Sequence, residues 1–205
     1  MPPKTVRILA LLLVALLLAV GRTTAAEFTL EPVPRGLVVP DGRLTDWPDS
    51  SFRPLTGTDT KNPPLWASAY DGVFLHFALK VSDSTPEFND YLHPDFLTND
   101  TVLLLLEGRE SFEFSITYLA QPGRTLVFPP VPWLAATLLP SKTGYTVEIS
   151  LAVHRLGGLK ETGSIRVQLV VLDVSQGILE KVYTLSGSET LWRDSADFST
   201  LALKT

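Results

Sequence analysis

Hydrophobic and polar residues alternate with a period of two along most of the chain, and no comparable helical periodicity occurs. Residues 73–81 show the pattern: one face carries Val73, Leu75, Phe77, Leu79 and Val81, and Asp71-Gly72 before it suits a hairpin turn. The same pattern predicts further strands at residues 66–70, 111–119, 145–151, 165–173, 178–185 and 198–203, and residues 101–107, apolar on both faces, are typical of a central strand. Many short strands separated by Gly, Pro and Asp turns indicate an all-β fold, an antiparallel β-sandwich or a barrel.

Three stretches interrupt the alternation, namely residues 51–64, 83–99 and 128–140. The first is polar, the second mixes acids with aromatics, and the third is rich in proline around Trp133. We interpret them as long surface loops, where binding residues tend to lie, or as coverings of sheet edges. Only residues 151–159 are expected to hold a helical turn.

The first 26 residues have the organisation of a signal peptide. Lys4 and Arg7 precede an apolar run of thirteen residues, and Thr24-Ala25-Ala26 suits a signal-peptidase site. The run is shorter than the ~20 residues that span a bilayer as a helix. We therefore expect cleavage before Glu27, a single domain over residues 27–205, and a secreted protein in the periplasm or outside the cell.

Charge and cysteine content narrow the class of partner. Removing residues 1–26 takes away three cations and no acid, so the formal charge moves from −5 to −8. This argues against nucleic acid and against anionic membrane surfaces, and it fits neutral sugars or cations. The chain has no cysteine, so disulfides and thiolate metal sites are excluded, and bound ions would need oxygen ligands.

Several short motifs occur in a particular order. They are the segments 39–47 (VPDGRLTDW), 70–77 (YDGVFLHF), 81–83 (VSD), 99–102 (NDTV), 144–149 (GYTVEI), 171–173 (VLD) and 191–194 (LWRD) with Phe198 and Leu201. In this order the chain resembles the family 9 carbohydrate-binding modules over nearly all of residues 27–205. The resemblance implies a jelly-roll-like sandwich, structural calcium, and a sugar held between two tryptophans.

The residues of the implied sugar site agree only in part with the family. Trp192 matches one stacking tryptophan, whereas the second falls on Leu97. The polar positions of the family fall on Leu103, Ser115 and Val170, which removes most hydrogen bonds to sugar hydroxyls. Because indole rings stack on the apolar faces of sugars, our candidates for carbohydrate binding are Trp192, Trp66, Trp133, Glu189 and Arg193. Trp47, beside a turn, is expected to be structural.

Calcium takes six to eight oxygen ligands, which turns must bring together. Aspartates lie at predicted turns and strand ends throughout the chain, and no loop matches an EF-hand. The candidate metal ligands are Asp41, Asp46, Asp71, Asp83, Asp100 and Asp173, each of which could instead only cap its own turn.

Enzymatic motifs are missing: there is no Gly-x-Ser-x-Gly elbow and no pair of histidines at metal-ligand spacing. Glu113 and Glu148 are interpreted as solvent-facing members of amphipathic strands rather than as a glycosidase pair. We therefore predict a non-catalytic protein.

Two alternatives to sugar binding stay open. One is an accessory or adhesion sandwich that binds a protein partner or a cell-wall polymer through the apolar segment 128–139. The other is a haem-binding electron-transfer sandwich, for which His76 and His154 are the candidate axial ligands.

Overall fold

The computed structural model describes residues 26–57, 59–88, 98–157, 159–186 and 195–204. The strands are β1 (Glu27–Pro32), β2 (Arg53–Pro54), β3 (Thr56–Gly57), β4 (Leu65–Tyr70), β5 (Phe74–Ser82), β6 (Thr101–Glu107), β7 (Ser111–Leu119), β8 (Arg124–Phe128), β9 (Leu134–Ser141), β10 (Gly144–Ala152), β11 (Ser164–Ser175), β12 (Ile178–Thr184) and β13 (Ser199–Leu203). Helical structure is limited to short turns, η1 (Asp49–Ser51), η2 (Val153–Arg155), α2 (Leu159–Thr162) and η3 (Ser195–Asp197).

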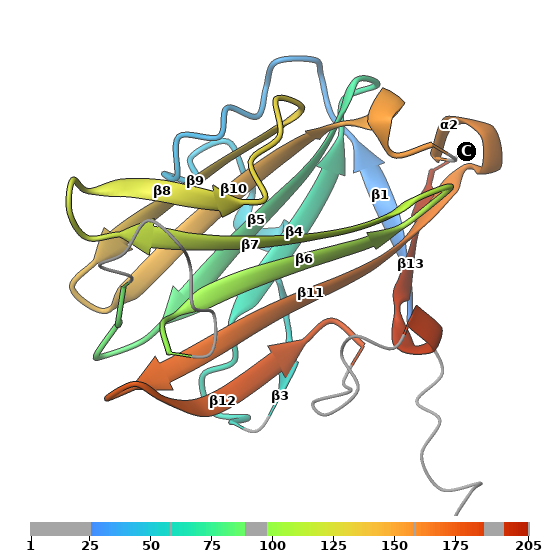
Figure 1. The fold of residues 1–205 in the computed structure, drawn as a ribbon. Coiled ribbons are helices and arrows are strands. Elements are labelled where there is room, and N and C mark those ends of the chain that lie inside the picture. The colour runs from blue at the N-terminus through green and yellow to red at the C-terminus, as the bar shows by residue number, and fades with distance from the viewer. Residues whose placement is uncertain (1–25, 58, 89–97, 158, 187–194, 205) are drawn as a thin grey trace, which may run out of the picture.

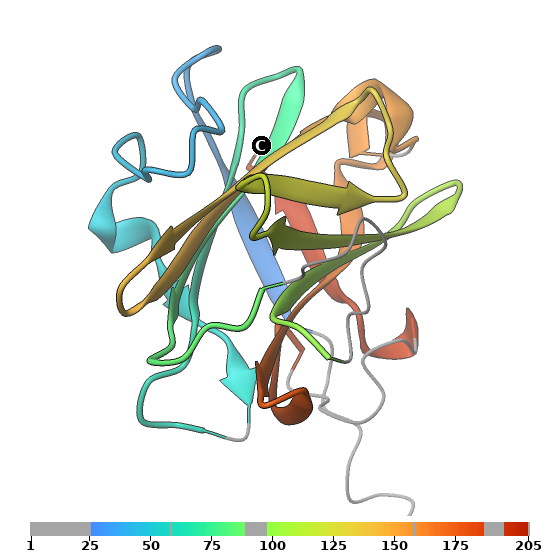
Figure 2. The same cartoon turned by 60° about the vertical axis from the view of Figure 1, so that its left-hand side comes forward.

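The strands form two facing layers (Figures 1 and 2). One layer has the order β8-β7-β6-β11-β13, with β12 paired to β11 and β3 paired to β12, and the other has the order β4-β5-β10-β9. β1 joins the two layers, because it pairs in parallel with β13 at Glu27 and with β4 at Glu31. At the far edge the Leu138 N–H donates to Thr125 Oγ1 (2.7 Å), which links β9 to β8. The predicted all-β sandwich is therefore confirmed, with a nearly closed sheet.

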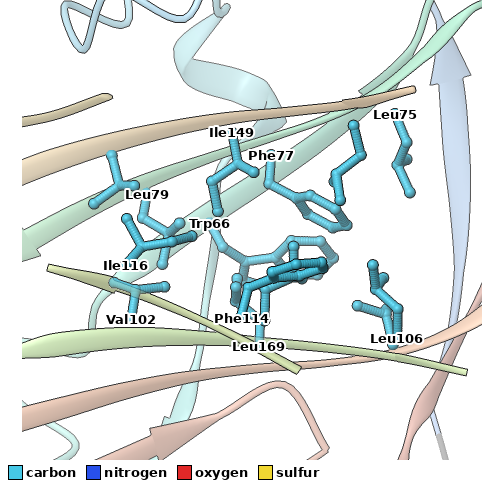
Figure 3. Close-up of a cluster of buried hydrophobic side chains, with 14 of the residues drawn as sticks. Trp66, Leu75, Phe77, Leu79, Val102, Leu106, Phe114, Ile116, Ile149 and Leu169 are labelled. Carbon is cyan, nitrogen blue, oxygen red and sulfur yellow. The ribbon is translucent and has the colours of Figure 1, made fainter. Parts of the chain in front are cut away.

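Alternating side chains of the two layers meet in the main hydrophobic core between them (Figure 3). Trp66, Leu75 and Phe77 point down from one layer, and Val102 and Phe114 point up from the other. All five are at most 2% exposed. Burial of apolar area on this scale is the main term that stabilises a fold without disulfides.

Most predicted strands form within one or two residues of their predicted ends, since alternation is a local signal. The pattern did not predict β1, β8 or the two-residue strands β2 and β3, which lie within the predicted loop 51–64. It also failed at segment 128–140, which we expected to be a long surface loop. This prediction is wrong for Leu134–Ser141, which forms β9 and pairs antiparallel with β10 from Leu134↔Leu151 to Ser141↔Gly144. Pro140 is tolerated there because β9 lies at the end of the strand order, where a missing N–H costs no ladder bond.

A second correction concerns the outer face of β5 and β10. Glu148 was expected to face solvent, but it is 0% exposed. The segment before η1 packs over this face, and small side chains there (Ala67, Ala69 and Ala78) leave room for Val38, Leu44 and Trp47. The alternation within a strand does not show whether a distant segment covers its polar face, so the burial of Glu148 could not be predicted from it.

Glu148 holds this covering segment in place. Its carboxylate accepts hydrogen bonds from Gly42 N–H (2.6 Å) and from Trp47 Nε1 (2.8 Å). Gly42 has a φ of 82°, and a Cβ there would lie 2.9 Å from the Cβ of Leu139, so the close approach requires glycine. The motif at residues 39–47 is thereby joined to the Gly-Tyr-x-Val-Glu motif of β10, and Trp47 is structural as predicted.

Candidate functional site

Three of the six candidate aspartates converge at one end of the sandwich. Asp83 follows β5, Asp100 precedes β6, and Asp173 lies near the end of β11, so the two layers both contribute. One carboxylate oxygen from each of the three lies within 4.8 Å of the others. We call these three residues the aspartate cluster.

Asp100 is the most buried member, with 1% of its surface exposed. Its two oxygens accept hydrogen bonds from Glu87 N–H (2.9 Å) and Val174 N–H (2.8 Å). Burial raises the pKa of Asp100 to about 8, and the neighbouring Asp83 carboxyl acts in the same direction, although the two N–H donors oppose both effects. Burial also raises the pKa of Asp173, although Lys181 Nζ lies 3.2 Å from its carboxylate.

Two buried polar atoms at the cluster have no hydrogen-bond partner among the described residues. One is Asp83 Oδ2, and the other is the hydroxyl of Tyr145, whose side chain is 2% exposed. Burial raises the pKa of Tyr145, and the charges of the three aspartates add to this effect, so its hydroxyl faces the cluster. Such orphaned oxygens fit an oxygen-bound cation such as calcium.

The main chain around the cluster is tied down on both sides. Glu87, four residues after Asp83, accepts hydrogen bonds on its carboxylate from the N–H groups of Gln176 and Gly177 in the β11–β12 turn. The Asp83 N–H donates to Thr143 O (3.0 Å) at the start of β10. The cluster thus lies where chain segments from both layers are joined.

The other three candidate aspartates lie elsewhere and cap their own turns. Asp41 Oδ1 accepts the Arg43 N–H (2.8 Å), and Asp46 Oδ2 accepts the Val39 N–H (3.1 Å). Asp71 Oδ1 accepts the N–H groups of Val73 and Phe74 in the hairpin. The structure does not bring these three into the cluster.

A groove around Trp133 lies at the opposite end of the strands. β6 and β10 start near the aspartate cluster and end near this groove, beside the β6–β7 turn and α2 (Figure 1). It consists of two hollows of about 280 and 360 Å³ that share Trp133, His154 and Arg155 as lining residues. The first hollow is completed by Arg109, Glu110 and Phe112, and the second by Phe74, Ala135 and Ser150, among others. We call it the Trp133 groove.

The Trp133 ring is half-buried, and two phenylalanine rings packed against it fix its orientation. Phe112 and Phe114 pack against it edge to face, with ring centroids 5.1 and 5.4 Å away. Trp133 O also accepts the Ala152 N–H (2.9 Å), which anchors the backbone at the start of β9. A fixed aromatic surface beside polar groups is suited to bind a ring with one apolar face.

The remaining carbohydrate candidates are placed differently. Trp66 is 2% exposed and packs edge to face on Phe28 (4.9 Å), so it belongs to the core and presents no surface to a ligand. Trp192, Glu189 and Arg193 lie outside the described residues, as does Leu97. Trp66 also lines a hollow of about 370 Å³, but only 2% of its surface is exposed, whereas Trp133 is half-buried and lines both hollows of the groove.

Sequence reasoning missed several polar residues of these two sites. Ser150 and Tyr145 were assigned only as ordinary members of the β10 alternation, and Arg155 was not singled out. Ser150 Oγ lies 2.8 Å from Nδ1 of His76, which is 2% exposed. His76 therefore offers no open imidazole to an iron, whereas His154 is exposed. In the sequence, the available signal for Ser150 was its position near the end of the predicted strand at residues 145–151.

No protein-family model matches the chain, and no curated protein sequence matches it. Among solved structures, a family 9 carbohydrate-binding module from Caldicellulosiruptor kristjanssonii in complex with glucose aligns with a TM-score of 0.67 at 13% identity, covering 87% of this chain and 95% of that one. A family 9 module from the same organism in complex with cellotriose aligns with a TM-score of 0.66 at 14% identity, covering 87% and 93%. This chain has the fold of the family 9 carbohydrate-binding modules.

The family 9 resemblance predicted from the ordered motifs is thus confirmed at the level of the fold. In the part of the chain that the structure describes, no helix has the length and apolar character needed to cross a membrane.

Proposed function

We propose that this protein is an exported, non-catalytic carbohydrate-binding module that binds a sugar or polysaccharide by stacking on tryptophan. The observation that carries the proposal is the family 9 fold, shared with modules solved with glucose and cellotriose over most of both chains. Export rests on the signal-peptide pattern of residues 1–26.

In this proposal Trp133 is the stacking surface within the described residues. The apolar face of a pyranose would lie on the indole, and its hydroxyls would reach the polar rim formed by Ser150, His154 and Arg155. Trp192 supplies a second stacking ring by its match to the family motif.

Among the described residues, one arrangement resembles the triad of a hydrolase, and its geometry is compatible with a non-catalytic role. Ser150, His76 and Asp71 follow one another in space, with Nδ1 of His76 2.8 Å from Ser150 Oγ. However, Nε2 of His76 is 3.6 Å from Asp71 Oδ2, and Asp71 Oδ1 already accepts two main-chain N–H groups of its hairpin. Asp71 and His76 are therefore interpreted as structural, and no step of catalysis is assigned to them.

We further propose that the aspartate cluster holds a structural calcium ion. Asp83, Asp100 and Asp173 would be its carboxylate ligands, and the ion would supply positive charge to three acids that crowd one another. Because the ligands come from β5, β6 and β11, the bound ion would tie the two layers together at this end.

The alternative is binding of a protein partner through segment 128–139. Its support is that Phe128 and Leu139 are 42% and 43% exposed, although Leu134 and Leu138 of the same segment are buried in the sandwich. A partner would therefore contact the outer side of β8 and β9 rather than a free loop.

A glycan array with the processed protein, followed by titration of tryptophan fluorescence, tests the proposed function. We expect binding to at least one glycan, and a loss of about tenfold or more in affinity for Trp133→Ala, since a stacking contact contributes about 1–3 kcal/mol to binding. Trp133→Phe is the matched control, because it keeps a ring on Phe112 and Phe114. If no glycan binds the folded protein, the proposal is wrong and the partner alternative gains.

A further inference from the structure

The charge around the Trp133 groove differs from that of the whole protein. Residues 27–205 carry a formal charge of −8, yet Arg109, His154 and Arg155 line the groove with Glu110 as its one acid. Arg109 is already paired, since its guanidinium lies 2.6 Å from Glu161. Arg155 forms no ion pair within the described residues, and it lines both hollows beside the Trp133 ring.

The backbone beneath Arg155 is held firmly. Arg155 ends η2, in which Val153 is buried and its N–H donates to Val73 O (2.9 Å). The following Leu156 is 1% exposed, and its N–H donates to Val153 O (3.0 Å). The guanidinium therefore extends from a fixed point on the rim rather than from a free loop.

The floor of the second hollow carries a preorganised polar group. Ser150 is 6% exposed and lines this hollow, and its hydroxyl is oriented by the buried imidazole of His76 at 2.8 Å. A single hollow thus combines a flat apolar ring, an oriented hydroxyl and an unpaired guanidinium. A planar guanidinium matches a carboxylate in two-point geometry, whereas neutral hydroxyls need no such charge.

We propose that the Trp133 groove recognises an acidic sugar, that is, a uronic acid unit of a polysaccharide. Its ring stacks on Trp133, its carboxylate pairs with Arg155, and one of its hydroxyls bonds to Ser150. This inference rests on the proposed function, and it names the class of sugar for this groove.

Titration calorimetry of the full processed protein with three oligosaccharides of equal length tests the inference. The probes are an oligogalacturonate or oligoglucuronate, a neutral cello-oligosaccharide, and dextran sulfate as a polyanion without carboxylates. We expect the uronate to bind at least tenfold more tightly than the other two. Arg155→Gln should remove this preference, and Arg155→Lys should restore only part of it, because lysine keeps the charge but not the two-point geometry.

Arg35→Gln, an exposed arginine outside the groove, is the matched control and should leave the preference unchanged. Circular dichroism and melting curves confirm that each variant is folded. Equal binding of dextran sulfate, preference for the neutral sugar, or an unchanged Arg155→Gln overturns the inference while leaving sugar binding intact. Binding of none of the glycans, here and on the array, means that the proposed function has failed as well.

Discussion

The protein contains two groups of clustered carboxylates that are built in opposite ways. Around Glu148, with Asp41 and Asp46 nearby, each carboxylate is satisfied by N–H donors of the chain. In the aspartate cluster three carboxylates face one another, and Asp83 Oδ2 has no donor among the described residues. The first group fixes the covering segment to the sheet through hydrogen bonds. The second offers several carboxylate oxygens close together, as a cation-binding site does.

The difference shows that clustering of acids does not by itself indicate a metal. Burial raises the pKa of Glu148, although the hydrogen bonds from Trp47 and Gly42 oppose it. Burial raises the pKa of Asp100 to about 8, and the neighbouring Asp83 carboxyl adds to this effect. What separates the two groups is the close approach of three carboxylates in the aspartate cluster, where Asp83 Oδ2 has no donor among the described residues. Four measurements can test that separation.

The largest expected effect is at Glu148. Glu148→Ala leaves Gly42 N–H and Trp47 Nε1 buried without an acceptor, and each such donor costs about 1–3 kcal/mol. We therefore expect a loss of about 3–5 kcal/mol in the free energy of unfolding, measured by urea denaturation. Glu148→Gln should lose less, since its amide oxygen still accepts one bond. The loss in the free energy of unfolding should be the same in calcium and in chelator. A loss seen in only one of these buffers would mean that Glu148, like the aspartate cluster, responds to the cation.

The next effect is the response to calcium. At about 100 times its dissociation constant, an ion that binds only the folded state stabilises it by about 2.7 kcal/mol. Calcium should raise the melting temperature of the wild type, and Asp83→Asn and Asp173→Asn should abolish this response. In chelator the same variants should be as stable as the wild type or more so, because one repelling charge is gone. Glu31→Gln, at an exposed acid of β1 outside the cluster, is the control that should keep the response. Identical wild-type melting curves in calcium and chelator would refute the ion.

A smaller effect is the dependence of stability on pH in chelator. The folded state keeps a proton on Asp100 up to about pH 8, whereas the unfolded chain releases it near about 4. Between these values the folded state binds more protons, so stability falls as pH rises from about 4 to about 8. Thermal melts across this range should show the decline in chelator and a weaker one in calcium, which replaces the proton. Stability that rises with pH in chelator would contradict the raised pKa of Asp100.

The smallest effect is expected at Glu31, whose carboxylate lies 3.1 Å from Lys204 Nζ on the surface. Both side chains are more than half exposed, so solvent screens the pair. Glu31→Gln should change the free energy of unfolding by less than about 0.5 kcal/mol in either buffer. A larger change would mean that removing even an exposed carboxylate lowers the free energy of unfolding. The effects at Glu148 and at the aspartate cluster could then not be assigned to their specific contacts.

The local signals in the chain were sufficient for the layered β fold. Alternation places β7, and a run that is apolar on both faces places β6, each correctly to the residue; Asp71-Gly72 forms the predicted hairpin. The order of the motifs was sufficient to anticipate the family 9 fold. Strand patterns and turns depend on neighbours within a few residues, and the order of the motifs is a property of the sequence itself. Both can therefore be recognised without coordinates.

Other properties depended on contacts between distant segments. Nothing in the local pattern distinguishes Asp83, Asp100 and Asp173 from Asp41, Asp46 and Asp71, because all six sit at turns. Pairing of β6 with β11, and of β5 with β10, brings the first three together. In the same way, the sequence does not distinguish Trp66 from Trp133. Packing of the two layers buries Trp66 and leaves Trp133 beside a groove. Strand identity is a short-range property of the chain, whereas the membership of a site is a long-range one, set when the two sheets close over their core.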